Sequence, residues 1–493
     1  MGFNSLTFIG FFAAVLLVFL LTQKKFKAPL LLVASYVFYW PISPSMVLLL
    51  FLLTFVSYGL ALLIDRSKGR HREITLYISL FITLGTLFYF KYFNFISENL
   101  NQFFHLPAIF RYQIQLEVVG LSFIVFQITS YLVDVFYRSV QTEKNFFDYA
   151  LFVAFFPKLL QGPLERAQNL LPQIQNLDTP NFENLKSGLM LVLWGLFLKT
   201  VVADRIGAMY VDSIYSDLNT AETFGTLLAI FFYTAQIYFD FSGYTNIAIG
   251  VSLCFGVNLS KNFNSPMLAK SCTDFWRRWH ITLSNWLRDY LFLPLQMEFR
   301  ALGVHGAVIA TLITFLIAGL WHGANWGFIA FGLMHGVWLS IEIYSNHILK
   351  KHRRIKVLIA SPFMQHVKLA ITYTLVSITF VFFRSPEIDT AQLVLGAFFR
   401  ASSELLNWHP ETPQIIYSAF LGDYKNPYQQ LRLFNFLVLI TAFFVIGTIH
   451  IYSKRCSFDR FPKINQWLCA EALLISIVLL GVNHGSHFAY FKF

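Results

Sequence analysis

The stretch "VHGAVIATLITFLIAGLWHGANWGFIAFGLMHGVWLSIEIYS" (residues 304–345) consists of two long apolar runs joined by the short polar segment "HGAN". A run of about 18 or more apolar residues is long enough to cross a bilayer as a helix. We therefore predict two membrane crossings here, at 304–320 and 326–345. The polar segment between them carries a histidine, and an ionisable group at such a place is costly unless it is used.

The same pattern extends over the whole chain of 493 residues, of which 56% are hydrophobic and only 13% charged. A soluble protein carries roughly a quarter charged residues. The composition therefore predicts an all-α polytopic membrane protein with about 11–12 transmembrane helices, and it excludes soluble classes, nucleic-acid-binding proteins among them. The predicted crossings are 6–23, 28–40, 46–64, 73–96, 115–138, 186–203, 222–240, 304–320, 326–345, 366–384, 433–452 and 466–482.

The basic residues predict the orientation of the chain in a cell (inner or cytoplasmic) membrane. Short loops rich in Lys and Arg remain in the cytoplasm. With about twelve crossings, both termini and the acidic segment 385–431 are expected outside the cytoplasm. The loops expected inside are "KKFK" (24–27), "DRSKGRHR" (65–72), "YRSVQTEK" (137–144), "KKHRRIK" (350–356) and "SKRCSFDR" (453–460).

Two segments are unsuited to a simple crossing. Residues 151–174 are apolar but interrupted by prolines, which predicts a re-entrant or interfacial segment lined by protein or water. Residues 265–295 alternate aromatic with charged side chains, which predicts an amphipathic helix at the cytoplasmic face. No internal repeat is present, so the chain 1–493 is expected to form one domain.

His322, at the outer end of the crossing at 304–320, is the first candidate site residue. It is either an interfacial histidine in a belt with Trp321 and Trp326, since aromatic residues favour this depth, or a functional group within the membrane. Position alone leaves the two interpretations equally open.

His280 is the second candidate, and it follows Arg277, Arg278 and Trp279 in the segment "FWRRWH". The two arginines either contact anionic lipid headgroups or form a cationic cradle for a phosphate-bearing donor from the cytosol. His335 is expected to be a packed or hydrogen-bonded helix residue.

Other polar groups lie within predicted crossings. Asp240 is expected to face a partner or water, because a bare carboxylate in lipid is costly, and to position an arginine or a histidine. Gln127, Ser130 and Asp134 are spaced by three and four residues and share a helix face, which favours interhelical hydrogen bonds. The 4 cysteines have no paired spacing, so neither a disulfide nor a metal site is predicted.

Three long motifs, in this order and spacing, resemble the membrane-bound O-acyltransferase (MBOAT) family: "FDFSGYTNIAIG" (239–250), "FWRRWHITLSNWLRDYLFLPL" (275–295) and "GLWHGANWGFIAFGLMHG" (319–336). Together with "FFPKLLQGPLER" (155–166), the resemblance covers about residues 115–345. It points to the bacterial polysaccharide O-acetyltransferases, which acetylate alginate or peptidoglycan and are related to the teichoic acid D-alanyl transferase. The resemblance implies a ring of tilted helices around a cytoplasmic funnel and a tunnel toward the outer face.

Carried over onto matching positions, the resemblance implies that His322 is the catalytic histidine and His280 the second signature histidine. The C-terminal "FAYFKF" (488–493) resembles an aromatic tail of this branch, which implies that Tyr490 accepts the acyl group in a relay. Ala489 stands where a bulkier aliphatic residue is commoner.

The chemistry of acyl transfer fits these residues. A base must remove the proton of the acceptor hydroxyl, and a histidine with an ordinary pKa of about 6.5 is largely neutral at pH 7. The oxyanion that develops needs a hydrogen-bond donor, for which Asn325 or a freed backbone N–H after Gly323 is the candidate by its spacing. We expect acetyl-CoA as the donor substrate, no bound cofactor, a polysaccharide acceptor, and an extracytoplasmic acetyltransferase- or esterase-like partner.

Two other classes of protein remain open from the residues alone. A proton-coupled transporter of an acyl or lipid-linked substrate would use the histidines as relay groups, although such proteins often contain internal repeats. A scaffold would recruit an extracytoplasmic enzyme through the segment 385–431 and the tail.

Overall fold

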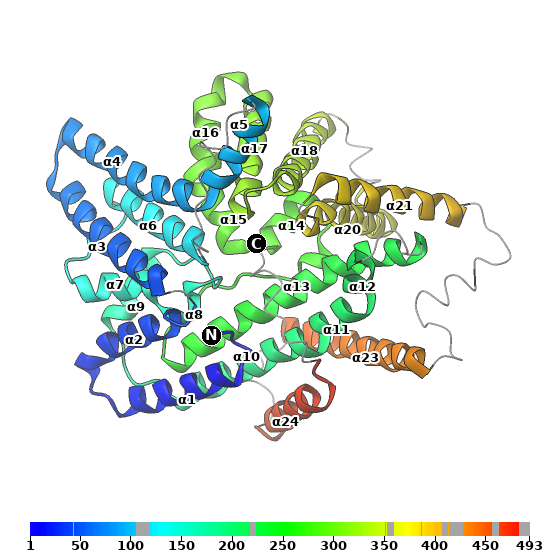
Figure 1. The fold of residues 1–493 in the computed structure, drawn as a ribbon, viewed down its shortest axis with the longest axis horizontal. Helices are drawn as coiled ribbons and strands as arrows, with labels where there is room; N and C mark the ends of the chain where they lie inside the picture. Colours follow the sequence, from blue (N-terminus) through cyan, green and yellow to red (C-terminus); the bar gives the residue numbers. More distant parts are fainter. Residues whose placement is uncertain are drawn as a thin grey trace. The chain divides into compact units, whose positions relative to one another are not determined.

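A computed structural model of the chain describes residues 1–42, 44–104, 119–216, 223–350, 352, 359–385, 387–406, 413, 427–455 and 463–482. The regular secondary structure in these ranges is helical, and none of their residues lies in a strand (Figure 1). The predicted all-α class is therefore confirmed.

The chain divides into two compact units, each assembled from three segments. Unit 1 comprises Met1–Val192, Thr245–Asn264 and His280–Met297. Unit 2 comprises Leu193–Tyr244, Ser265–Trp279 and Glu298–Phe493. The helices α10 (Phe182–Leu196) and α13 (Thr223–Cys254) run from one unit into the other.

The remaining helices of unit 1 include long apolar helices near the N-terminus and shorter ones after residue 145. They are α1 (Leu6–Leu21), α2 (Lys24–Tyr39), α3 (Pro44–Arg66), α4 (Gly69–Leu87), α5 (Phe93–Phe104), α6 (Leu121–Phe136), α7 (Phe146–Ala154), α8 (Phe156–Leu159), α9 (Ala167–Gln175), α15 (Ile281–Leu287) and α16 (Leu293–Glu298). A π-helical turn, Phe88–Tyr92, joins α4 to α5, and another, Arg288–Phe292, joins α15 to α16.

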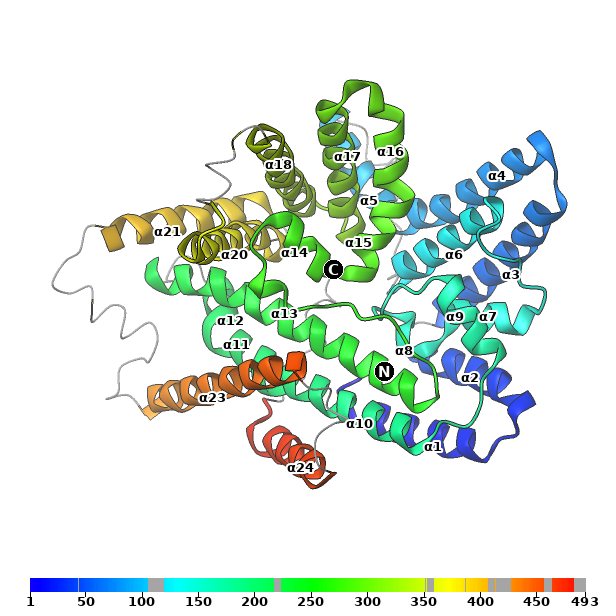
Figure 2. The same cartoon turned by 180° about the vertical axis from the view of Figure 1, so that it is seen from behind.

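Unit 2 contains the helices on either side of the "WHG" segment. Its elements are π-helical η3 (Phe197–Ala203) and η4 (Gly207–Val211), α11 (Asp204–Ile206), α12 (Asp212–Ser216), α14 (Cys272–Arg278), α17 (Val304–His322), α18 (Trp326–Leu349), α20 (Pro362–Arg384), α21 (Ile388–Leu406), α23 (Pro427–Arg455) and α24 (Lys463–Leu480). α17 and α18 lie side by side, as Figure 2 shows from behind.

Capping side chains determine where several helices begin. Ser5, Asn145, Ser271, Asn325 and Ser361 each accept a hydrogen bond from a backbone N–H of the first turn that follows. Such a bond satisfies one of the orphan donors of a helix N-terminus and stabilises the helix by about 1 kcal/mol. The sequence therefore separates α17 from α18 at a defined point.

The long helices have the length and composition of membrane spans. Seven of them qualify within the described residues: Pro44–Arg66, Gly69–Phe104, Phe182–Val211, Phe224–Cys254, Val304–His322, Trp326–Leu349 and Pro362–Arg384. Four shorter apolar helices, at Leu6–Leu21, Leu121–Phe136, Leu433–Gly447 and Leu468–Leu480, coincide with further predicted crossings. The crossing predicted at 28–40 lies on α2, which belongs to neither group.

Two details of the sequence prediction are wrong. Residues 265–295 do not form one amphipathic helix, because the chain breaks between α14 and α15, where His280 adopts a left-handed backbone with φ 41°. The aromatic residues of this segment are buried in the protein, Trp276 and Trp286 at 6% exposure each. The segment expected as a loop from 385 contains the 19-residue helix α21.

Candidate active site

His322 is the last residue of α17, and only 4% of its surface is exposed. Its imidazole lies among aromatic rings of unit 2, with the ring of Phe383 at 5.1 Å and that of Phe331 at 5.6 Å between centroids. Both rings meet the imidazole nearly edge-on, at 75° and 88°. His322 is therefore enclosed by protein at the end of α17.

The backbone directly after His322 leaves no room for a side chain at position 323. A Cβ atom on Gly323 would lie 2.2 Å from the ring of Phe328, far inside van der Waals contact. The side-chain Oδ1 of Asn325 accepts the backbone N–H of Phe328 at 3.0 Å. This bond fixes the amide plane of Asn325, so its remaining hydrogen-bonding group is the NH₂ donor.

His335, on α18, is held at both ring nitrogens. The indole N–H of Trp276 donates to His335 Nδ1 at 3.3 Å, so the ring proton lies on Nε2, which donates to Thr379 Oγ1 at 3.0 Å. The predicted role of His335 as a hydrogen-bonded helix residue is confirmed.

His280 belongs to unit 1, where it is 0% exposed and precedes α15. Its Nδ1 lies 3.2 Å from Asn262 Oδ1, an oxygen that also accepts the N–H and the hydroxyl of Thr282. Because this oxygen is only an acceptor, Nδ1 is the donor and Nε2 is the basic nitrogen. Burial lowers the pKa of His280 to about 3, so the imidazole is neutral at physiological pH.

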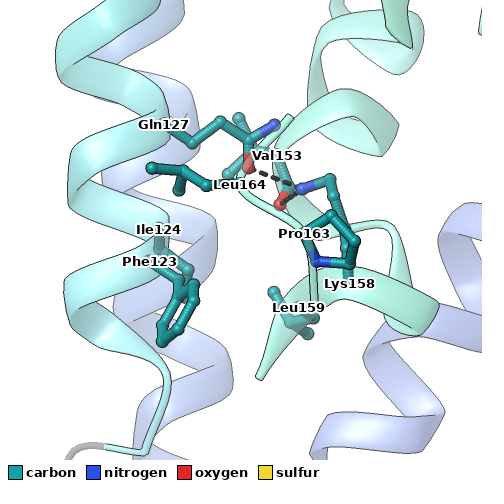
Figure 3. A pocket seen from close by; sticks show the side chains of 8 residues that line it. All are labelled: Phe123, Ile124, Gln127, Val153, Lys158, Leu159, Pro163 and Leu164. Carbon is teal, nitrogen blue, oxygen red and sulfur yellow. Dashed lines mark hydrogen bonds between the residues drawn. The ribbon is translucent and has the colours of Figure 1, made fainter. Parts of the chain in front are cut away.

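A small pocket lies beside His280, because the ring of Phe123 both lines the pocket and stacks on the imidazole at 6.1 Å. Figure 3 shows the Lys158 amine inside it, donating to Gln127 Oε1 at 2.5 Å and to the Val153 carbonyl at 3.1 Å. Burial lowers the pKa of Lys158 to about 7. The sequence analysis missed Lys158, although a lysine inside the apolar run at 151–160 was a usable signal.

The three residues expected to bind the donor differ in their surroundings. Arg277 is exposed. Arg278 pairs with Asp274, four residues earlier, at 2.7 Å. Trp279 is 2% exposed and stacks on the Phe275 ring at 5.4 Å. Of the three, Arg277 is the exposed residue, whereas Trp279 packs in the interior of unit 2.

Asp240 has a charged partner, which is a lysine and not the arginine or histidine that the sequence suggested. The buried ammonium of Lys199 donates to Asp240 Oδ1 at 2.6 Å and to Asp204 Oδ1 at 2.7 Å. This group of charges joins η3 and α11 to α13 inside unit 2 and has a structural role. The identity of the partner as Lys199 was not predictable, because 41 residues separate the two side chains in sequence.

The three polar residues on α6 also form contacts. Gln127 donates to the Phe152 carbonyl at 2.8 Å, and Asp134 accepts the Tyr290 hydroxyl at 2.7 Å, which confirms bonding between segments. Ser130 instead donates to a carbonyl of its own helix.

The C-terminal tail, the cysteines and the question of a metal site complete the predictions made from the sequence. Tyr490 and the rest of the tail lie outside the described residues, as does Cys456. Cys254, Cys272 and Cys469 are free thiols. Across the part of the chain that the structure describes, no three His, Cys, Asp or Glu side chains gather as metal ligands.

Comparisons with known proteins show which family this chain resembles. The model of the membrane-bound O-acyltransferase family matches residues 34–381. A "Probable alginate O-acetylase" of Azotobacter vinelandii is 35% identical, over 81% of this chain and 78% of the relative. A "Peptidoglycan O-acetyltransferase" of Helicobacter pylori is 30% identical over 100% and 97%. A "Teichoic acid D-alanyltransferase" of Streptococcus thermophilus is 26% identical over 56% and 70%.

Proposed function

The chain belongs to the membrane-bound O-acyltransferase family, and from this premise we propose that it transfers acetyl groups from cytosolic acetyl-CoA to an extracytoplasmic polysaccharide. Family membership makes it a multi-pass membrane acyltransferase. Peptidoglycan as the acceptor is supported by the Helicobacter pylori relative, which the chain matches over its full length. Alginate is supported by the relative from Azotobacter vinelandii, which has the higher identity.

The observation that carries this proposal is the burial of His322 at the end of α17, directly before Gly323, where a side chain would meet the Phe328 ring. In the proposed reaction the neutral imidazole removes the proton of the acceptor hydroxyl as its oxygen attacks the thioester carbonyl. The surrounding phenylalanines exclude water, which limits hydrolysis of the thioester. The NH₂ group of Asn325, oriented by its cap bond to Phe328, is our candidate donor to the oxyanion.

The cytosolic donor has its own set of proposed contacts. His280 is proposed as the second catalytic histidine, with Nε2 as its basic nitrogen. Arg277 and Arg278 are proposed to bind the phosphates of acetyl-CoA, since guanidinium groups pair well with phosphate. Trp279 would support this surface from within.

The destination of the acetyl group requires a further step outside the cytoplasm. We place the protein in the cytoplasmic membrane with both termini outside, so that the tail faces the acceptor. A relay through Tyr490 to an extracytoplasmic acetyltransferase or esterase-like partner is part of this proposal. It is supported by the resemblance of the tail to that branch of the family.

The first test follows the acetyl group itself. Purified protein is mixed with acetyl-CoA labelled in the acetyl group, and both free CoA and labelled peptides are measured. We expect His322→Ala to lower transfer about 10²–10⁴-fold, the usual contribution of a general base. His305→Ala, at the other end of α17, serves as the matched control and is expected to retain transfer.

Each outcome distinguishes one part of the proposal. Label on Tyr490 that disappears in Tyr490→Phe and His322→Ala would support the relay. CoA release that depends on His322 without labelled protein would retain the enzyme and remove the relay. Normal transfer by His322→Ala would refute the catalytic assignment.

A further inference from the structure

The backbone at His280 is held in an uncommon conformation by Asn262. His280 has a left-handed φ of 41°, which persists in a residue with a side chain only where neighbouring groups hold it. The main-chain carbonyl of Asn262 accepts the N–H of Ile281 at 2.9 Å, and Asn262 Oδ1 accepts both the N–H and the hydroxyl of Thr282. The same Oδ1 orients the imidazole through Nδ1 at 3.2 Å. The placement of His280 therefore depends on where Asn262 lies.

Asn262 lies on a segment without helical structure, residues 257–263, so contacts from elsewhere must fix its position. Glu165 makes such a contact two residues before Asn262. Its Oε1 accepts the backbone N–H of Ser260, and its Oε2 accepts the Ser260 hydroxyl at 3.1 Å. Because two bonds join one carboxylate to one residue, Ser260 can neither rotate nor shift freely.

The Glu165 carboxylate is itself held firmly. Glu165 is 1% exposed, and a carboxylate buried to this extent is costly unless donors surround it. Asn169, in the first turn of α9, donates to Oε2 at 2.6 Å, in addition to the two groups of Ser260. Each of these bonds is one that the carboxylate accepts, which suits the ionised form. A glutamine at this position could accept at only one of the two atoms.

The residue before Glu165 contacts the same surroundings. The backbone N–H of Leu164 donates to Thr282 Oγ1 at 3.0 Å, and this hydroxyl donates in turn to Asn262 Oδ1 at 2.9 Å. Leu164 and Glu165 therefore hold two different segments that meet at Asn262, one at Thr282 and the other at Ser260.

We propose that Glu165 is a positioning residue for acetyl transfer: it fixes Ser260 and thereby holds Asn262 where this side chain orients the imidazole of His280. All of these residues belong to unit 1. Glu165 acts through Asn262 and takes no part in making or breaking bonds. The inference rests on the proposed function, in which His280 is the second catalytic histidine.

Kinetics separate this role from a general effect on stability. Release of CoA from acetyl-CoA is measured with the full-length protein in detergent, well below the Tm of each variant. We expect Glu165→Ala to lower kcat about 10–100-fold, the cost of displacing a reacting group by about 1 Å, and to leave the KM for acetyl-CoA unchanged. The loss should disappear in an Asn262→Ala background, because the link to His280 is already broken there.

The matched control is Gln173→Ala, which releases the same segment at a point farther from Asn262. Gln173 Nε2 donates to the Asn258 carbonyl at 3.0 Å, and its Oε1 accepts the Asn258 N–H at 2.8 Å. Both bonds are exposed, so their loss should lower Tm slightly. We expect kcat to stay at the wild-type value in Gln173→Ala.

The position of the imidazole is measured without transfer. Diethyl pyrocarbonate modifies accessible neutral imidazoles, and peptide mass identifies the modified residues. His280 is 0% exposed and should be protected in the wild type and in Gln173→Ala, whereas the exposed His71 should react in every variant. In Glu165→Ala we expect His280 to react, because the segment that carries Asn262 is no longer fixed.

Three results would overturn the proposal. They are a wild-type kcat in Glu165→Ala, an equal loss of kcat with and without Asn262→Ala, and continued protection of His280 in Glu165→Ala. If Glu165→Ala does not fold, Glu165→Gln takes its place. It keeps one acceptor oxygen, so a smaller loss of the same kind is expected, and an unchanged kcat would again refute the proposal.

The proposed function fails separately, through normal transfer by His280→Gln or the absence of CoA release from the wild type. Modification by diethyl pyrocarbonate would then still show whether Glu165 holds the imidazole of His280 in place.

Discussion

The two histidines of the site differ in what holds them. His280 has a defined tautomer, because Asn262 Oδ1 can only accept and so requires the proton on Nδ1. His322 is enclosed by aromatic rings, those of Phe331 and Phe383 lying 5.6 and 5.1 Å from the imidazole between centroids.

The lowered pKa of His280 predicts acid sensitivity of the fold. The unfolded chain takes up this proton near pH 6.5, whereas the folded protein does so only near pH 3. Below pH 6.5 the unfolded state therefore binds more protons, and stability falls by up to about 1.4 kcal/mol per pH unit as the pH decreases toward 3. Thermal unfolding of the detergent-solubilised protein between pH 7.5 and 5 should show this slope, and His280→Gln should reduce it.

The matched variant for this test is Thr282→Val, which breaks a hydrogen bond to Asn262 but keeps the imidazole. It should lower Tm at every pH and leave the slope as in the wild type. An identical slope in wild type and His280→Gln would show that another group causes the acid sensitivity.

At the residue scale, sequence predicts the type of interaction better than its partner. Asp240 was expected to face a partner and His335 to be hydrogen-bonded, because the cost of an unpaired polar group in a membrane is general. Their partners Lys199, Trp276 and Thr379 come from other segments, and only the folded chain brings them together.

At the element scale, the close packing of α17 on α18 depends on facing glycines. A Cβ on Gly332 would lie 2.3 Å from the Phe315 carbonyl oxygen and 2.9 Å from the Cα of Gly319. Small residues let membrane helices approach this closely. Because His322 and Asn325 lie in the connection between these two helices, their spacing depends on this contact.

Gly332→Ala should therefore separate α17 from α18. The added methyl group meets backbone rather than a flexible side chain, so we expect a loss of about 1–3 kcal/mol in stability together with reduced transfer. Gly59→Ala on α3 is the control, since a Cβ there meets nothing within 4 Å, and it should be neutral or slightly stabilising. Thermal unfolding and CoA release measure the two effects, and an unchanged Tm in Gly332→Ala would contradict the packing argument.

Elements with a long apolar run are predictable from sequence, whereas broken segments are not. The crossings at 304–320 and 326–345 coincide with α17 and α18, because Asn325 caps the second helix where the pattern changes. The segment 265–295 has the composition of one amphipathic helix, yet the backbone of His280 divides it. A left-handed residue that is neither Gly nor Asn has no reliable signal in sequence.

At the scale of the whole molecule, the sequence motifs predict the family, whereas the apolar pattern predicts single helices and not how they pack together. The family resemblance rests on long motifs and is confirmed by the match over residues 34–381. The interleaving of two units along the chain has no counterpart in the apolar pattern, because that pattern records local burial and not which segments pack together.

The orientation of the chain is a prediction of the basic loops, and accessible cysteines can test it. Lys68 lies in a basic loop expected in the cytoplasm, and Glu387 in the segment expected outside; both are exposed. In a background with all 4 native cysteines replaced by Ser, Glu387→Cys should react with a membrane-impermeant maleimide in intact spheroplasts, and Lys68→Cys only after lysis. Seven predicted crossings separate the two positions, so labelling of both from one side would mean that one crossing is wrong. His322 would then not be expected near the outer face, and the proposed path of the acetyl group to the acceptor would have to change.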